Sequence, residues 1–74
     1  MREKAVRREA VESSSLKSVG YAPESRTLEV EFHHGAVYQY LGVPPNVHEA
    51  LMRAESKGTF LNREVRDIYP YERR

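Results

Sequence analysis

The stretch that decides the fold is Arg26–Leu41, with the sequence RTLEVEFHHGAVYQYL. Its first half alternates apolar and acidic side chains, in the order Leu28, Glu29, Val30, Glu31 and Phe32. Alternation with a period of two is typical of a strand that has one buried and one solvated face. The second half is again rich in β-forming residues, and the residues between the two halves are typical of a turn. The stretch therefore predicts a β-hairpin.

The turn of this hairpin decides where its tyrosines point. A two-residue type I′ turn at His34-Gly35 would require positive φ at a histidine, whereas a type I turn at His33-His34 requires it only at Gly35, as a bulge. We favour the second turn, which places Phe32 opposite Ala36. On that register the core face of the hairpin carries Leu28, Val30, Tyr38 and Tyr40. A tyrosine in such a thin sheet buries its ring and leaves its hydroxyl at the rim.

The segments before the hairpin carry weaker signals. Residues 16–21 alternate with a period of two and predict a strand, which ends at the turn residues 22–25. Residues 1–12 are rich in Arg, Glu and Ala, with an apolar stripe too narrow to pack strongly. We expect residues 1–12 to form a frayed or disordered helical extension, whose removal changes stability little.

The segments after the hairpin predict two helices. Pro44-Pro45 opens the first, and Gly58 is expected to end it as a left-handed cap. Its apolar stripe consists of Val47, Ala50, Leu51 and Ala54. A second helical stretch follows between Thr59 and Ile68, with either Thr59 or Asn62 as its N-cap. Its apolar stripe consists of Leu61, Val65 and Ile68.

The predicted order is thus three strands followed by two helices. One face of a three-stranded antiparallel sheet must be covered, and two short amphipathic helices are the natural cover. The predicted fold class is α+β, with a three-stranded antiparallel sheet (βββ) followed by two short helices packed on one face. Residues 13–69 form the domain and residues 70–74 a C-terminal tail, which leaves Tyr71 outside the packed core.

Composition excludes several classes of protein. The 74 residues include 12 Lys+Arg, 11 Asp+Glu and no cysteine, and the formal net charge is +1. Disulfide frameworks and thiolate zinc sites are therefore excluded, and the charge is too balanced to mark a nucleic-acid-binding protein by itself. No apolar run reaches the length of a signal sequence or a membrane span. We expect a small, soluble, cytoplasmic monomer.

The residue types that carry catalysis and metal binding are poorly placed. His33 and His34 are adjacent in a turn, and His48 has no partner at a chelating spacing, so no metal site is predicted. The chain has neither a cysteine nucleophile nor a Gly-x-Ser-x-Gly elbow. Its four glycines are scattered singly and cannot form a phosphate-binding loop. We expect neither an enzyme nor a bound cofactor.

An ordered set of short motifs spans most of the chain. It consists of Val19-Gly20-Tyr21, then Leu28, Val30, Phe32 and Gly35, then Tyr38-x-Tyr40, Val43-Pro44, Ala54-x-Ser56-x-Gly58-x-Phe60-x-Asn62 and Tyr69. Over residues 13–69 this spacing resembles the KTSC domain, a short module named for its place at the C-terminus of some lysyl-tRNA synthetases and found also as a stand-alone bacterial protein. The resemblance implies a family without an established biochemical activity, for which RNA binding is a proposal drawn from the synthetase association.

The leading hypothesis is a small non-catalytic module that binds RNA or tRNA weakly and with little sequence preference. The candidate residues could stack on bases or contact phosphates: Tyr38, Tyr40, Ser56, Lys57, Asn62, Arg63 and Arg66. Asn62 and Arg66 are four residues apart and share a helix face; alternatively, Asn62 is only a cap and Arg66 a solvated charge. A second hypothesis is a protein-interaction module that uses a sheet edge or the exposed row with Val37 and Leu41. An enzyme is a third.

Overall fold

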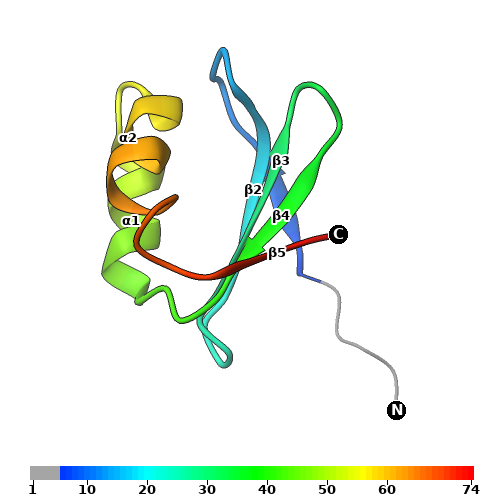
Figure 1. Cartoon of the computed structure of the whole chain (residues 1–74). Coiled ribbons are helices and arrows are strands. Elements are labelled where there is room, and N and C mark those ends of the chain that lie inside the picture. Colours follow the sequence, from blue (N-terminus) through cyan, green and yellow to red (C-terminus); the bar gives the residue numbers. More distant parts are fainter. Residues whose placement is uncertain (1–5) are drawn as a thin grey trace.

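The computed structural model describes residues 6–74, and its centre is the hairpin of β3 (Thr27–Phe32) and β4 (Val37–Tyr40) (Figure 1). Gly35 has a φ of 101°, and its amide donates to the carbonyl of Phe32 at 2.9 Å. The Phe32 amide donates to the carbonyl of Ala36, also at 2.9 Å. The bulged turn is therefore confirmed, and with it the register that pairs Val30 with Tyr38.

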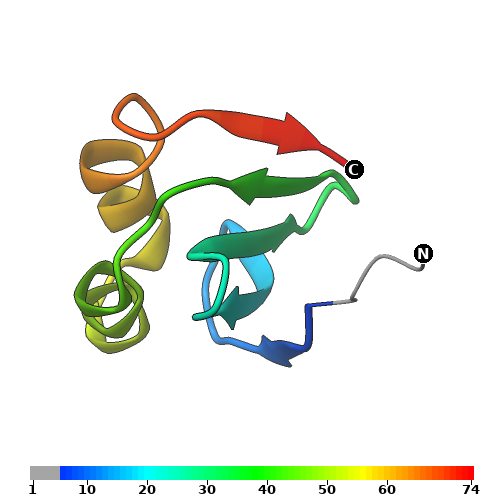
Figure 2. The ribbon, with the colours of Figure 1, turned by 90° about the horizontal axis from the view of Figure 1, so that it is seen from below.

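The sheet has five antiparallel strands, not the three predicted, in the order β1-β2-β3-β4-β5. The predicted first strand is β2 (Leu16–Ala22). The two additional strands are β1 (Arg8–Ala10) and β5 (Tyr71–Arg73), one at each edge (Figure 2). Residues 8–10 thus form a strand where a frayed helix was expected, and residues 71–73 form a strand where a tail was expected; residues 1–5 lie outside the described part of the chain.

Tertiary pairing explains both additional strands. A three-residue segment has almost no intrinsic preference for a strand, and the helix predicted for residues 1–12 would have been marginal in water. The edges of β2 and β4, however, each present a row of backbone donors and acceptors that can pair with a further strand. The β4 edge shows the result, because the amide of Leu41 donates to the carbonyl of Pro70 and the amide of Arg74 to that of Val37.

Two helices, α1 (Pro45–Arg53) and α2 (Lys57–Glu64), cover one face of the sheet (Figure 1). The prediction of Gly58 as a left-handed cap is wrong, because α1 ends at Ala54 and Gly58 lies inside α2. The N-cap of α2 is Ser56, whose Oγ accepts from the Thr59 amide, rather than Thr59 or Asn62. Neither helix of residues 6–74 has the length or apolar character needed to cross a bilayer.

Gly58 is required for a different reason. A Cβ at this position would lie 2.7 Å from Oγ of Ser15, so the first turn of α2 rests directly against the segment that leads into β2. The apolar stripe of α2 also ends earlier than predicted, because Leu61 and Val65 are buried whereas Ile68 is 58% exposed.

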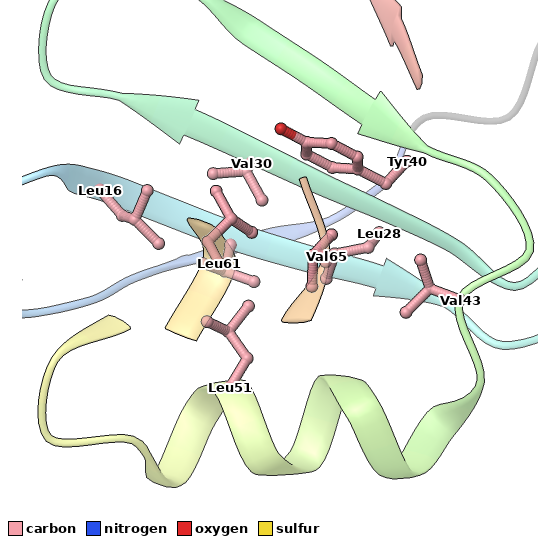
Figure 3. Close-up of a cluster of buried hydrophobic side chains, with 9 residues drawn as sticks. Leu16, Leu28, Val30, Tyr40, Val43, Leu51, Leu61 and Val65 are labelled. Atoms are coloured by element: carbon pink, nitrogen blue, oxygen red, sulfur yellow. The ribbon is translucent and has the colours of Figure 1, made fainter. Parts of the chain in front are cut away.

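The core lies between the sheet and the helices (Figure 3). Its buried members are Leu16, Val19, Leu28, Val30, Tyr40, Val43, Leu51, Leu61 and Val65. A bulge between Leu16 and Ser18 allows Leu16 and Val19, three residues apart, to face the core together. Phe32 and Tyr38 pack against this core but are only partly buried.

The opposite face of the sheet is more buried than the sequence predicted. One row of paired residues crosses all five strands: Arg8, Gly20, Glu29, Gln39 and Glu72. Glu29, expected in solvent, is only 6% exposed and accepts from Arg8 Nη1 at 2.6 Å and from Gln39 Nε2 at 2.7 Å. Gly20 allows this contact, because a Cβ there would lie 2.3 Å from the backbone oxygen of Arg7 and 2.9 Å from Cγ of Arg8.

Candidate nucleic-acid interface

A cavity of about 240 Å³ lies where β4 and β5 meet α2. We call it the aromatic chamber. Its sheet side is formed by Tyr38, Tyr40 and Tyr71. Its other side is formed by Leu61 and Asn62 of α2 and by Arg66, which follows the helix. Phe32 and His34 complete the lining near the β3–β4 turn.

The register of the sheet brings the rings of this chamber together. Tyr38 and Tyr40 are two residues apart on β4 and share its core face, and Tyr71 on β5 is the paired residue of Tyr40. The ring centroids of Tyr38 and Tyr71 are 5.1 Å apart, and those of Tyr40 and Tyr71 are 5.7 Å apart. Tyr40 is 2% exposed and Tyr71 is 55% exposed, so Tyr40 lies at the bottom of the chamber and Tyr71 at its rim.

The aromatic surface continues toward the turn. The Phe32 ring meets the Tyr38 ring edge to face at 5.5 Å, and His34 stacks on Phe32 with an interplanar angle of 1°. On the other side of Tyr38, the guanidinium of Arg73 lies 6.0 Å from the ring centroid, a distance at which cation–π attraction operates. Aromatic faces therefore line the chamber from its rim to the turn.

Arg66 and Asn62 supply the polar groups of the chamber. Arg66 Nη1 donates to Oδ1 of Asn62 over a long 3.4 Å, which leaves most of the five guanidinium N–H donors free of this contact. Burial raises the pKa of the Tyr40 phenol, and the positive charge of Arg66 opposes this shift. Because Arg66 and Tyr40 line the same cavity, the guanidinium can act on a group bound there.

The other three predicted site residues lie outside the aromatic chamber. Ser56 caps α2, and the Nζ of Lys57 donates to the carbonyl of Ala54 at 3.1 Å. Arg63 and Ser56 line a different, shallow cavity with Thr59. Arg66 lies in the turn that follows α2, because the helix ends at Glu64 and does not continue to Ile68 as predicted. Asn62 and Arg66 line the aromatic chamber, whereas Arg63 lines the other cavity.

The structure therefore divides the seven predicted residues into two groups. It brings together Tyr38, Tyr40, Asn62 and Arg66, and it places Ser56, Lys57 and Arg63 elsewhere. Phe32 could have been added from the sequence, because the hairpin register puts it beside Tyr38. From the sequence Tyr71 was expected only to lie outside the packed core, where it could stack on a base; its place beside Tyr40 depends on the pairing of β5 with β4.

The chemistry of the aromatic chamber is that of recognition. Its phenols and rings stack, its amide offers a donor and an acceptor, and its guanidinium attracts negative charge. Among residues 6–74 no group of three or more His, Cys, Asp or Glu side chains converges on a point where a metal ion could be held.

Comparison with known proteins gives the family. The family model of the KTSC domain matches residues 12–69. The chain belongs to the KTSC domain family. A KTSC domain protein from Yersinia pestis, solved by crystallography, superposes with a TM-score of 0.88 at 39% sequence identity and covers 95% of this chain and 99% of its own. The KTSC match contains every residue of the aromatic chamber except Tyr71.

Two kinds of curated relative share the KTSC segment. An uncharacterised protein from Stutzerimonas stutzeri is 53% identical over 57 residues, which are 77% of this chain and 80% of that protein. A lysine–tRNA ligase from Nostoc punctiforme is 39% identical over 61 residues, which are 82% of this chain but only 11% of the ligase. The resemblance to a module of lysyl-tRNA synthetases is thereby confirmed, and it concerns a small part of those enzymes.

Proposed function

We propose that this KTSC domain is a non-catalytic, cytoplasmic, monomeric module that binds single-stranded RNA by taking an unpaired base into the aromatic chamber. The observation that carries the proposal is the meeting of stacking rings with Asn62 and Arg66 in one cavity. Sequence-tolerant RNA binding uses this combination, because every base has a π face and every nucleotide a phosphate. The KTSC segment within a lysine–tRNA ligase supports RNA as the partner.

The size of the chamber suits a single base. Pockets for drug-sized ligands have volumes of about 300–1,000 Å³. The aromatic chamber, at about 240 Å³, is smaller and accommodates one flat ring system rather than a whole nucleotide. The sugar and phosphate then remain at the rim, within reach of Arg66 and Arg73.

The charge of the protein sets the strength of binding. A net charge of +1 gives little long-range attraction, so affinity depends on the local cations and is expected to be micromolar at best. Lys57 is engaged by the carbonyl of Ala54, and Arg63 lies at the other cavity. Arg66 and Arg73 are therefore the cations that support phosphate contacts, and two such contacts imply a slope of log affinity against log salt of about −1.4.

A protein partner is the second candidate and has less support. The β4 edge beside Val37 and Leu41 is already paired with β5, so an incoming strand would have to add to β1 or β5, each only three residues long. A dry protein contact would also weaken little with salt, whereas phosphate contacts weaken steeply. Salt dependence therefore separates the two candidates.

The test measures binding of labelled single-stranded RNA and of tRNA by fluorescence anisotropy over a series of salt concentrations. Arg66→Ala should weaken binding about tenfold and flatten the salt slope by about 0.7, the contribution of one phosphate contact. The matched control is Arg63→Ala, which removes the same charge from the last turn of α2, at the other cavity, and should change affinity less than twofold.

A second pair of variants tests the stacking surface. Tyr71→Ala should reduce affinity by about 1–3 kcal/mol, whereas Tyr71→Phe should retain it. Ile68→Ala is the control, because Ile68 and Tyr71 are the large apolar residues with similar exposure, 58% and 55%. Absence of binding to any RNA at low salt, by protein with a folded circular dichroism spectrum, would refute the proposal and favour a protein partner.

A further inference from the structure

A second cavity adjoins the aromatic chamber on the side of the β3–β4 turn. Its volume is about 400 Å³, and four residues line both cavities: Phe32, His34, Leu61 and Asn62. The rest of its lining consists of Ser14, Ser15, His33 and Gly58, and we call it the polar chamber. Because the chambers share these walls, they are two compartments of one groove that follows α2 from Gly58 and continues past its end to Arg66.

The polar chamber offers hydrogen-bonding groups that are not engaged within the protein. Ser13 is the serine that closes the local turn, since its Oγ accepts from the amides of Ser15 and Leu16. The hydroxyls of Ser14 and Ser15 are exposed and have no partner among residues 6–74. Each can both donate and accept a hydrogen bond.

His33 adds an acceptor of fixed position. Its Nε2 lies 2.8 Å from the carbonyl oxygen of Ser13, and a carbonyl can only accept, so Nε2 carries the proton. In the neutral ring the other nitrogen, Nδ1, is then an acceptor. The imidazole is therefore held in one orientation by the protein and keeps one nitrogen for a ligand.

The two chambers differ in charge. Arg66 lines the aromatic chamber, whereas no lysine or arginine among residues 6–74 lines the polar chamber. A phosphate is held best by cations, and a neutral polyol by groups that both donate and accept. The polar chamber thus has the chemistry for a sugar, and the phosphates belong at the Arg66 side of the groove.

We infer that the groove holds two consecutive ribonucleotides, with the base of one in the aromatic chamber and the ribose of its neighbour in the polar chamber. This inference rests on the proposed function and deepens it. Ser14, Ser15 and His33 bind the 2′-hydroxyl, the group by which proteins distinguish RNA from DNA. The polar chamber is then the determinant of RNA specificity, which stacking cannot supply because DNA bases stack equally well.

The experiment compares three short adenylate oligonucleotides of the same length on the wild-type protein: RNA, DNA and 2′-O-methyl RNA. Adenine is used because it is the same base in all three. RNA should bind about tenfold more tightly than DNA, which corresponds to one or two hydrogen bonds. The 2′-O-methyl oligonucleotide keeps an RNA-like sugar but lacks the hydroxyl donor, so it should bind no better than DNA.

Two variants assign the preference to the polar chamber. The double variant Ser14→Ala/Ser15→Ala should lower RNA affinity to the DNA level and leave DNA affinity unchanged. Arg66→Ala is the control, because loss of a phosphate contact should weaken RNA and DNA alike.

The outcomes separate the two proposals. Equal affinity for RNA and DNA, or 2′-O-methyl RNA bound as tightly as RNA, would overturn the inference while leaving base binding in the aromatic chamber intact. Absence of binding to all three oligonucleotides would overturn the proposed function itself. Because the three oligonucleotides are compared on the wild-type protein, the result does not depend on the folding of any variant.

Discussion

Replacement of Arg8 by methionine tests whether the N-terminal strand stabilises the domain. Arg8 Nη1 donates to Glu29 Oε2 at 2.6 Å, and the two side chains are 31% and 8% exposed. Arg8→Met keeps most of the aliphatic stem that packs across Gly20 and removes the charge. The carboxylate of Glu29 would then retain only the hydrogen bond donated by Gln39.

The loss of stability expected for Arg8→Met lies between two limits. Breaking a fully buried ion pair costs about 3–5 kcal/mol, because it leaves an uncompensated charge, whereas an exposed pair is worth about 0–1 kcal/mol. Here Glu29 is buried but Arg8 is partly exposed, so water can replace some of the lost contact. We expect Arg8→Met to destabilise the domain by about 1–3 kcal/mol, with a fall in thermal midpoint of about 4–8 °C for each kcal/mol.

The assay is urea denaturation followed by circular dichroism, with Arg7→Met as the control. Arg7 is the exposed neighbour of Arg8, and its replacement should change stability by less than about 0.5 kcal/mol.

Glu29→Gln removes the buried charge but keeps an oxygen that accepts from Gln39. The double variant Arg8→Met/Glu29→Gln should therefore be more stable than Arg8→Met alone. Equal stability of Arg8→Met and Arg7→Met would refute this reasoning and restore the expectation that residues 1–12 contribute little.

Two further predictions concern the helix-covered side. Leu51 is completely buried, so Leu51→Ala should cost about 2–5 kcal/mol in urea denaturation; a cooperative transition close to wild type would show that α1 does not cover the sheet in solution. Burial lowers the pKa of His48, and the charges of Glu9 and Glu49 oppose this shift. His48 therefore binds a proton more readily in the unfolded chain than in the folded one. Its contribution to the stability of the fold is fully present above its ordinary pKa of about 6.5 and is lost as the pH falls through the lower pKa of the folded state. The ring centroids of His48 and Tyr21 are 4.7 Å apart, and His48→Phe retains a ring to stack on Tyr21. Between about pH 7 and pH 5 the thermal midpoint of this variant should fall less than that of the wild type. Parallel curves of thermal midpoint against pH would contradict this assignment.

Local patterns in the sequence were sufficient for the centre of the fold. The alternation of Arg26–Leu41 and the left-handed requirement at Gly35 are properties of neighbouring residues, so the hairpin, its bulged turn and the core face of Tyr40 followed from them. Both helices were predicted for the same reason. The cap of α2 was misplaced, since Ser56 and Gly58 are both plausible boundary residues and only the hydrogen bond from the Thr59 amide to Ser56 Oγ shows that Ser56 is the cap.

The sequence could predict which candidate site residues lie together only where both residues belong to one helix or one strand. The four-residue spacing of Asn62 and Arg66 predicted a shared helix face, and the two-residue spacing of Tyr38 and Tyr40 predicted a shared strand face. Arg66 in fact lies in the turn after α2, and its meeting with Asn62 and the two tyrosines around one cavity depends on how α2 and this turn lie across the sheet. The spacing of residues along a helix also could not show that Arg63 lines a different cavity, because the position of a cavity depends on where the neighbouring elements end.

The sequence by itself thus determined the fold class, the central hairpin with its turn and the family of the chain, because these depend on short-range periodicity and on motifs of fixed spacing. Only the tertiary structure decided the two edge strands and the chamber wall that Tyr71 completes. Three-residue segments have no periodicity to read, and they become strands because the sheet offers unpaired backbone edges. The burial of Glu29 has the same origin, since it requires a strand far away in sequence to bring Arg8 across Gly20.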